Sequence, residues 1–71
     1  MDKKEIGQLL RTLRISQGLT LHELGSVCGL VKQHVSNIEK GTKSVSLKVL
    51  NKMLSIYDLQ AQIVIKKVKT P

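Results

Sequence analysis

The chain has 71 residues, with 12 Lys or Arg against 5 Asp or Glu, so its formal net charge is +7. This length predicts one domain with a modest core, and the single cysteine excludes an internal disulfide. The positive charge favours a polyanionic partner, either nucleic acid or an anionic lipid surface. No apolar run approaches membrane-spanning length and the charged N-terminus lacks the apolar stretch of a signal peptide, so we expect a cytoplasmic protein.

Residues 2–17 have the pattern of a first helix. Asp2 and Glu5 form a capping-box pattern, in which each side chain accepts a hydrogen bond from the backbone N–H of the other. One face carries apolar residues at the spacing of a core-facing helix, namely Ile6, Leu9, Leu10 and Leu13. Gly18 is placed to end this helix.

Residues 20–41 predict two short helices joined by a tight turn. Thr20 and Glu23 form a second capping box at the start of the first of them, and Gly29 provides the backbone freedom for the turn. The apolar face of this helix is formed by Leu21, Leu24, Val27 and Cys28. We place Cys28 in the core, as a small apolar residue.

The next helix is predicted over residues 31–39. Its inward face carries Val35 and Ile38. Its other face is polar, because four residues recur at spacings that gather them on one side of a helix, namely Lys32, Gln33, Ser36 and Asn37. Gly41 is placed to end it.

Ser46 predicts the start of a fourth helix as its N-cap, with Val45 and Leu50 as a hydrophobic staple. The helix has one broad apolar face, made of Leu47, Leu50, Met53, Leu54 and Tyr57. Tyr57 is the only aromatic residue, so the stacking of bases on aromatic side chains, on which single-strand and RNA recognition rely, is not expected.

From residue 59 the apolar period changes to two, which favours a β-strand. The alternating residues are Leu59, Ala61, Ile63 and Ile65. Since a lone strand is not stable, we expect it to pair with the same strand of a second copy across a two-fold axis. The predicted organisation is therefore a helical domain over 1–58, a dimerisation strand over 59–68 and a tail over 69–71.

The segment from Thr20 to Gly41 resembles the helix-turn-helix of the phage-repressor-like (Cro/CI, or XRE) family. The resemblance rests on the turn glycine Gly29, the apolar Val35 and the run Ser36–Gly41. It implies a mostly α, four-helix lambda-repressor-like fold that binds double-stranded DNA. It also implies that Arg14 of the first helix pairs with Glu39. The chain departs from the family at Leu21, where glutamine is usual, and at Val31, which is a poor N-cap.

With the added strand, the chain most resembles HipB-type antitoxins of this family. That resemblance implies a homodimer that represses its own operon and holds a HipA-type kinase toxin. Two alternatives stay open, namely a stand-alone or phage-type regulator without a toxin, and an interaction adaptor that has lost DNA binding. A HipA-like kinase encoded next to the gene would separate the first two, and the intact polar face argues against the adaptor.

Candidate DNA-binding residues follow from helix geometry and family position. Lys32 and Gln33 are the expected base readers, since Lys donates to guanine and Gln pairs with adenine. Ser36 and Asn37 lie one turn further along and are expected to be second-rank base readers or phosphate ligands. Phosphate contacts are expected from Lys40, Lys43, Thr20 and His22. A two-fold dimer would require a palindromic operator. As a DNA-binding protein, it is expected to associate with the nucleoid.

Other chemistry is not expected. The spacing of His22, Cys28 and His34 matches no tetrahedral metal site. No carboxylate pair is placed for acid–base chemistry, and no serine lies in a nucleophile-elbow pattern. We therefore expect no metal, no cofactor and no enzymatic activity.

Overall fold

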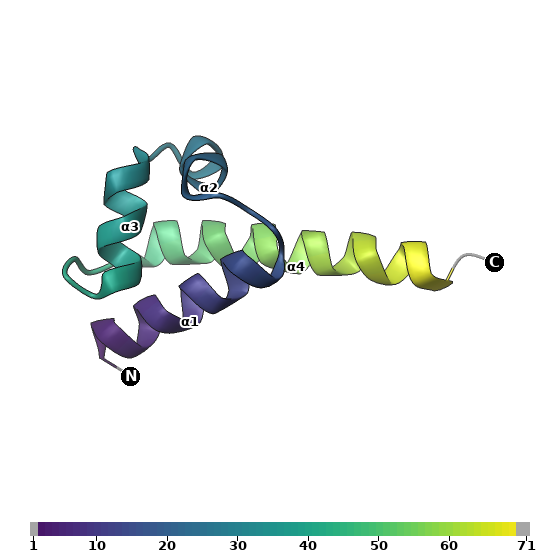
Figure 1. Ribbon diagram of the computed structural model, residues 1–71, viewed down its shortest axis with the longest axis horizontal. Helices are drawn as coiled ribbons and strands as arrows, with labels where there is room; N and C mark the ends of the chain where they lie inside the picture. The colour runs from purple at the N-terminus through teal and green to yellow at the C-terminus, as the bar shows by residue number, and fades with distance from the viewer. Residues whose placement is uncertain (1, 70–71) are drawn as a thin grey trace.

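The computed structural model describes the backbone of residues 2–69 and the side chains of residues 2–58. Within this range the chain forms four helices, which are α1 (Lys3–Ser16), α2 (Leu21–Cys28), α3 (Lys32–Lys40) and α4 (Leu47–Lys69). In Figure 1, α1, α2 and α3 gather around the first half of α4, and the second half of α4 extends away from them. The predicted four-helix, mostly α architecture is confirmed.

The predicted amino-terminal caps are present in three of these helices. The backbone N–H of Glu5 donates to the Asp2 carboxylate at 2.8 Å, and that of Thr20 donates to the Glu23 carboxylate at 2.9 Å. Both are parts of complete capping boxes. The Ser46 hydroxyl accepts a bond of 3.2 Å from the first turn of α4. These caps satisfy N–H groups that a helix leaves without partners, which explains why the helices begin where the sequence predicts.

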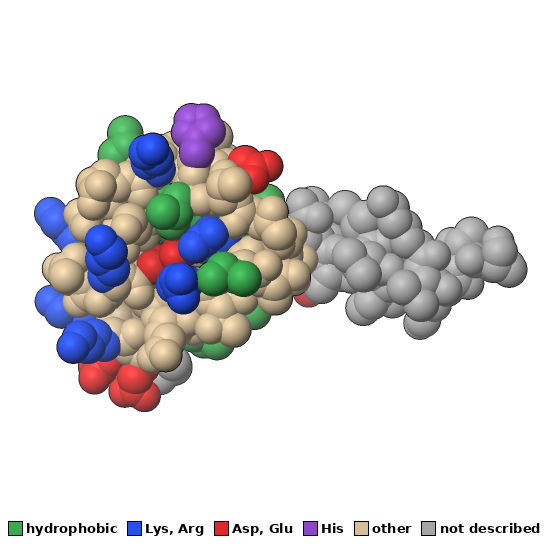
Figure 2. Space-filling model, in the orientation of Figure 1, with side chains coloured by type: hydrophobic (Ala, Val, Ile, Leu, Met, Phe, Trp, Pro, Cys, Tyr) green, Lys and Arg blue, Asp and Glu red, His purple; other side chains and the backbone are tan. Residues whose placement is uncertain are grey.

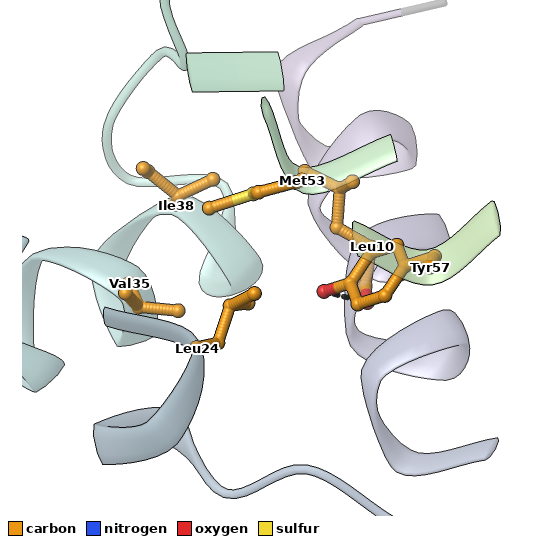
Figure 3. Packing of buried hydrophobic residues seen from close by; sticks show 6 residues of the cluster. All are labelled: Leu10, Leu24, Val35, Ile38, Met53 and Tyr57. Carbon is orange, nitrogen blue, oxygen red and sulfur yellow. Dashed lines mark hydrogen bonds between the residues drawn. The ribbon is translucent and has the colours of Figure 1, made fainter. Parts of the chain in front are cut away.

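The core lies where the four helices meet, and each helix contributes to it. Its buried side chains are Leu10, Leu24, Val35, Ile38, Met53 and Tyr57. Figure 3 shows these side chains converging, with Tyr57 against α1. The Tyr57 hydroxyl donates to the backbone oxygen of Leu10 at 3.5 Å, which gives the one polar atom of the cluster a partner.

The buried faces are narrower than the apolar stripes of the sequence. Four residues that we placed on core-facing stripes are exposed, namely Leu9 (46%), Val27 (54%), Leu47 (72%) and Leu54 (41%). Such a small domain has too little interior to cover a whole apolar stripe on every helix. The sequence therefore predicts the direction of each face correctly and its width incorrectly.

Two glycines that the sequence interpretation did not single out let the helices approach closely. A Cβ atom on Gly7 would overlap the backbone oxygen of Ile38 and lie 2.7 Å from that of Glu39. A Cβ atom on Gly25 would overlap the backbone oxygen of Leu30. Because Gly7 carries no side chain, α1 packs directly on the carboxyl end of α3. In the same way, Gly25 lets α2 pack directly on the turn that precedes α3.

The predicted C-terminal strand over 59–68 is wrong, because these residues continue α4 to Lys69. No Gly or Pro interrupts the chain between residues 47 and 69, and extending a formed helix costs much less than starting one. The side chains of Leu59, Ala61, Ile63 and Ile65 lie outside the described residues, so their assignment to a dimer interface stays a prediction. No described helix, α4 included, is long and apolar enough to cross a membrane.

Candidate nucleic-acid interface

The two faces of α3 differ as the sequence predicts. Val35 and Ile38 face the core with 0% and 2% of their surface exposed. On the other face, Lys32 and Gln33 are exposed at the amino end and Lys40 at the carboxyl end. The predicted second-rank readers, Ser36 and Asn37, are half-buried between them. Lys32 and Gln33 at the amino end of α3 are therefore accessible to a partner.

Gln33 is held in position by Asn37. The Gln33 side-chain nitrogen donates to the Asn37 side-chain oxygen at 3.1 Å, as expected for polar residues one turn apart on a helix. Gln33 keeps one N–H and its amide oxygen for other partners. One donor and one acceptor are what a bidentate contact with adenine requires. Asn37 therefore orients a candidate base reader.

The loop after α3 is anchored on the backbone of the same residue. The Asn37 backbone oxygen accepts from the Thr42 backbone N–H at 3.0 Å and from that of Lys43 at 3.3 Å, and from the Thr42 hydroxyl at 3.1 Å. Gly41 allows this reversal with a φ of 79°, which other residues rarely adopt. The candidate phosphate ligand Lys43 is thus fixed relative to the candidate reader Gln33. The sequence interpretation did not identify Thr42 as part of this link.

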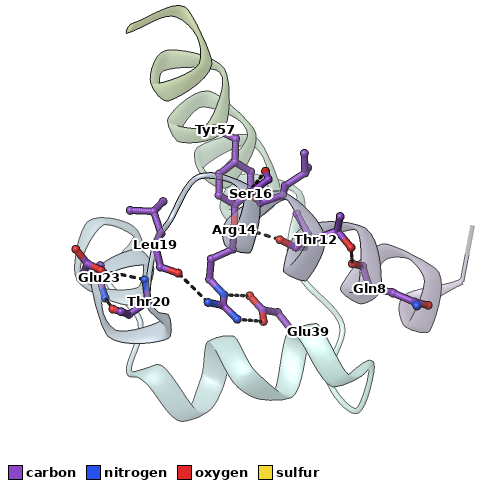
Figure 4. A network of polar contacts seen from close by, with 11 residues as sticks. Gln8, Thr12, Arg14, Ser16, Leu19, Thr20, Glu23, Glu39 and Tyr57 are labelled. Carbon is purple, nitrogen blue, oxygen red and sulfur yellow. Dashed lines mark hydrogen bonds and ion pairs between the residues drawn. The ribbon is translucent and has the colours of Figure 1, made fainter. Parts of the chain in front are cut away.

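The predicted ion pair between Arg14 and Glu39 is present and bidentate. Arg14 Nε lies 2.7 Å from Glu39 Oε2, and a second guanidinium nitrogen lies 3.0 Å from Oε1. A third donates to the backbone oxygen of Leu19 at 2.8 Å. Figure 4 shows the guanidinium between the Glu39 carboxylate and the turn before α2. One side chain of α1 therefore holds both helices of the helix-turn-helix.

The ion pair is almost fully removed from solvent, since 11% of the Arg14 side chain and 4% of the Glu39 side chain are exposed. The hydrogen bond to Glu39 raises the pKa of Arg14, which keeps the guanidinium charged. Burial raises the pKa of Tyr57 to about 12, and the negative charge of Glu39 adds to this shift. Tyr57 therefore stays neutral beside the pair at physiological pH.

The amino end of α2 offers two further candidates. The Thr20 hydroxyl oxygen accepts the Glu23 backbone N–H at 3.0 Å, so its role in the structure is that of a cap. The hydroxyl proton remains available to a phosphate oxygen. His22 is exposed in the first turn of α2. Both side chains are accessible at the end of α2 where we expected contacts with the DNA backbone.

Basic side chains are spread over one side of the molecule. In Figure 2, Lys and Arg side chains lie over α1, α3 and the loop after α3, with a histidine over α2, while acidic groups are visible near α2, at the amino end of α1 and in the centre. Among residues 2–58, no group of three or more His, Cys, Asp or Glu side chains could hold a metal ion. The functional features on this side are those of a polyanion-binding surface.

Two helices joined by a tight turn, with an exposed polar face on the second, define a helix-turn-helix domain. Residues 5–62 match the helix-turn-helix domain family, and the chain belongs to this family. The match extends four residues into the segment 59–68 for which the sequence predicts a strand.

Two relatives carry regulatory names. The chain is 36% identical over 52 residues to a Thermococcus kodakarensis protein named as an HTH-type transcriptional regulatory protein, TK0539. This match covers 73% of the chain and 16% of the Thermococcus protein, so the chain spans a small part of that relative's length. It also resembles the crystal structure of the clp gene regulator ClgR from Corynebacterium glutamicum, with a TM-score of 0.64 and 27% identity. That likeness covers 93% of this chain and 87% of the other.

Proposed function

We propose that the protein is a sequence-specific transcriptional repressor that binds double-stranded DNA as a homodimer. The observation that carries the proposal is the exposed polar face of α3, whose reader Gln33 is oriented by Asn37 at 3.1 Å. The formal net charge of +7 supports a polyanionic partner. In this proposal the protein has no catalytic activity and needs no cofactor. It acts on DNA in the nucleoid.

In the proposed complex the amino end of α3 enters the major groove. Lys32 and Gln33 would face base edges, since recognition helices of this kind read DNA with their first residues. Lys40 and Lys43 would contact phosphates, which gives affinity without sequence preference. Thr20 and His22 would contact the backbone from the amino end of α2.

The proposed dimer forms through the second half of α4. This half extends away from the other three helices in Figure 1, and its sequence includes Leu59, Ala61, Ile63 and Ile65. Two copies joined in this way would present two α3 helices to a palindromic operator, with half-sites about one DNA turn apart. A chain that ends after Asp58 should be monomeric by light scattering and should lose tight operator binding while its half-site contacts survive.

The antitoxin hypothesis is weaker than the general one. Part of its support was a C-terminal strand after four helices, and the structure has helix there instead. We therefore favour a regulator that needs no toxin partner, and keep an antitoxin and autorepressor of a HipA-type kinase as the second proposal. An adaptor without DNA binding is disfavoured because Lys32 and Gln33 remain exposed.

The test is selection of operator sequences from a random pool of duplex DNA, followed by titrations at several salt concentrations. Gln33→Ala should relax base preference at one or two positions, at a cost of about 1–3 kcal/mol for the preferred base. Gln8→Ala on the exposed face of α1 is the matched control and should leave the preference unchanged. An unaltered preference in Gln33→Ala would contradict the docking of α3.

Lys43→Ala distinguishes phosphate contacts from base contacts in the same titrations. It should weaken binding to all sequences alike and reduce the dependence of affinity on salt, because one fewer counterion is released. Lys52→Ala removes the same charge from α4 and should change neither quantity. Equal losses in the two variants would show that only overall charge matters.

A further inference from the structure

A second surface lies between the carboxyl end of α2 and the first turns of α4. It is an open groove of about 430 Å³, lined by residues 26–29 and by Lys48, Val49 and Lys52. None of these residues belongs to the candidate DNA-binding set. The groove therefore needs an explanation separate from DNA recognition.

The groove combines an apolar floor with a basic rim. Val27 leaves 54% of its surface exposed there, beside the half-buried Cys28 and Val49. Lys48 and Lys52 are exposed and one turn apart on α4, which places their side chains as neighbours. No acidic residue is among those that line the groove. Such a surface fits a partner that offers an apolar side chain between carboxylates, whereas a phosphate backbone would leave the apolar floor without a partner.

A second copy of the chain does not fit this description. Of its five acidic residues, Asp2, Glu5 and Glu23 serve in capping boxes and Glu39 is buried in its ion pair. Asp58 also has an interaction partner. Binding of a second copy through its carboxylates would compete with these interactions.

We propose that the groove between α2 and α4 is a docking site for an acidic, amphipathic segment of another protein. One apolar side chain of that segment packs on Val27 and Val49, and carboxylates about one helical turn apart pair with Lys48 and Lys52. Since the lining residues lie outside the candidate DNA-binding set, the protein can hold this partner and DNA at the same time.

The test uses a displayed library of random dodecapeptides, selected on the full chain in the presence of excess duplex DNA, which occupies the DNA-binding surface. The recovered peptides should contain at least two Asp or Glu and a large apolar residue. Labelled synthetic copies should bind the Lys48→Glu, Lys52→Glu double variant at least tenfold more weakly. The Lys3→Glu, Arg11→Glu double variant changes the net charge equally on α1 and should bind them like wild type.

The single cysteine reports where the peptide binds. Cys28 lines the groove, so a bound peptide should slow its reaction with a thiol reagent, while the same peptide with Gln in place of its acidic residues should not. Peptides without acidic residues, equal losses in the two double variants, or an unchanged Cys28 rate would overturn the proposal. Displacement of the peptide by duplex DNA would do so too, because the lysines would then belong to the DNA surface.

Discussion

The two helices of the helix-turn-helix are held by different means. α2 is capped locally at both ends, because a capping box at Thr20 and Glu23 starts it and Gly29 ends it with a φ of 73°. α3 has no side-chain cap, since Val31 precedes it. Its carboxyl end is instead fixed by the ion pair with Arg14, a residue 25 positions away. Local caps therefore set both ends of α2, whereas α3 lacks a side-chain cap at its start and has a long-range ion pair at its end.

This difference suits the proposed role of α3. The end with the long-range anchor points to α1, and the end without a cap carries Lys32 and Gln33. The first N–H groups of a helix need partners, so an uncapped amino end stays available to phosphate or water. The comparison also predicts that distant residues control the stability of α3 more than its own sequence does.

The largest expected effect comes from breaking the long-range anchor. Glu39→Ala leaves a buried guanidinium without its partner and should lower the free energy of unfolding by about 3–5 kcal/mol. Arg14→Met together with Glu39→Ala should be more stable than Glu39→Ala alone, because no buried charge is then unpaired. Urea denaturation followed by circular dichroism measures both. Unfolding midpoints equal to wild type in Glu39→Ala would exclude an anchoring role.

A second effect tests the same region through pH. The pKa of Tyr57 is about 12 in the folded state and about 10 in an unfolded chain. The folded state thus binds the hydroxyl proton of Tyr57 more tightly than the unfolded chain does. This difference contributes on the order of 2–3 kcal/mol to the free energy of unfolding, which is fully present below pH ~10 and is lost as the pH rises to ~12.

Tyr57 is the only tyrosine and there is no tryptophan, so ultraviolet absorbance follows the ionisation of this single group. Tyr57→Phe should remove the corresponding part of the loss of stability at alkaline pH. A titration midpoint at the ordinary value for tyrosine would show that the hydroxyl is solvated.

A smaller effect is expected from the local cap of α2. Thr20→Ala removes the acceptor for the Glu23 backbone N–H and should destabilise the fold by about 1 kcal/mol. Thr12→Ala removes an exposed threonine from the middle of α1 and should stay within about 0.5 kcal/mol of wild type. Urea denaturation of the two variants side by side measures the difference. Equal midpoints would show that the cap at Thr20 does not stabilise α2.

The smallest effect sharpens the comparison by giving α3 the cap that it lacks. Val31 is 72% exposed, so its replacement removes little packing. Val31→Ser supplies an oxygen acceptor and should stabilise the fold by up to about 1 kcal/mol. Val31→Ala, which supplies no acceptor, is the control. If both variants have the same stability, the amino end of α3 gains nothing from a side-chain cap.

Some errors in the sequence interpretation have a common cause. Leu9, Val27 and Leu54 lie on apolar stripes and are exposed, because the stripe shows which way a helix faces and the neighbouring helices decide how much of it they cover. The segment over 59–68 alternates like a strand, yet its Leu, Ala, Gln and Lys residues also favour a helix. A short alternating run could not distinguish the two, and the helix already formed before residue 59 continues.

The sequence by itself determined where α1, α2 and α4 start, where α1, α2 and α3 end, and which face of α3 is polar. These features depend on caps, glycines and spacing within a few residues of each other. The Arg14–Glu39 ion pair was also predicted, from the resemblance of the helix-turn-helix motif to the phage-repressor-like family. Only the tertiary structure decided why Gly7 must lack a side chain and that a groove opens beside Lys48 and Lys52. Those features depend on how separate helices approach each other, which no local pattern specifies.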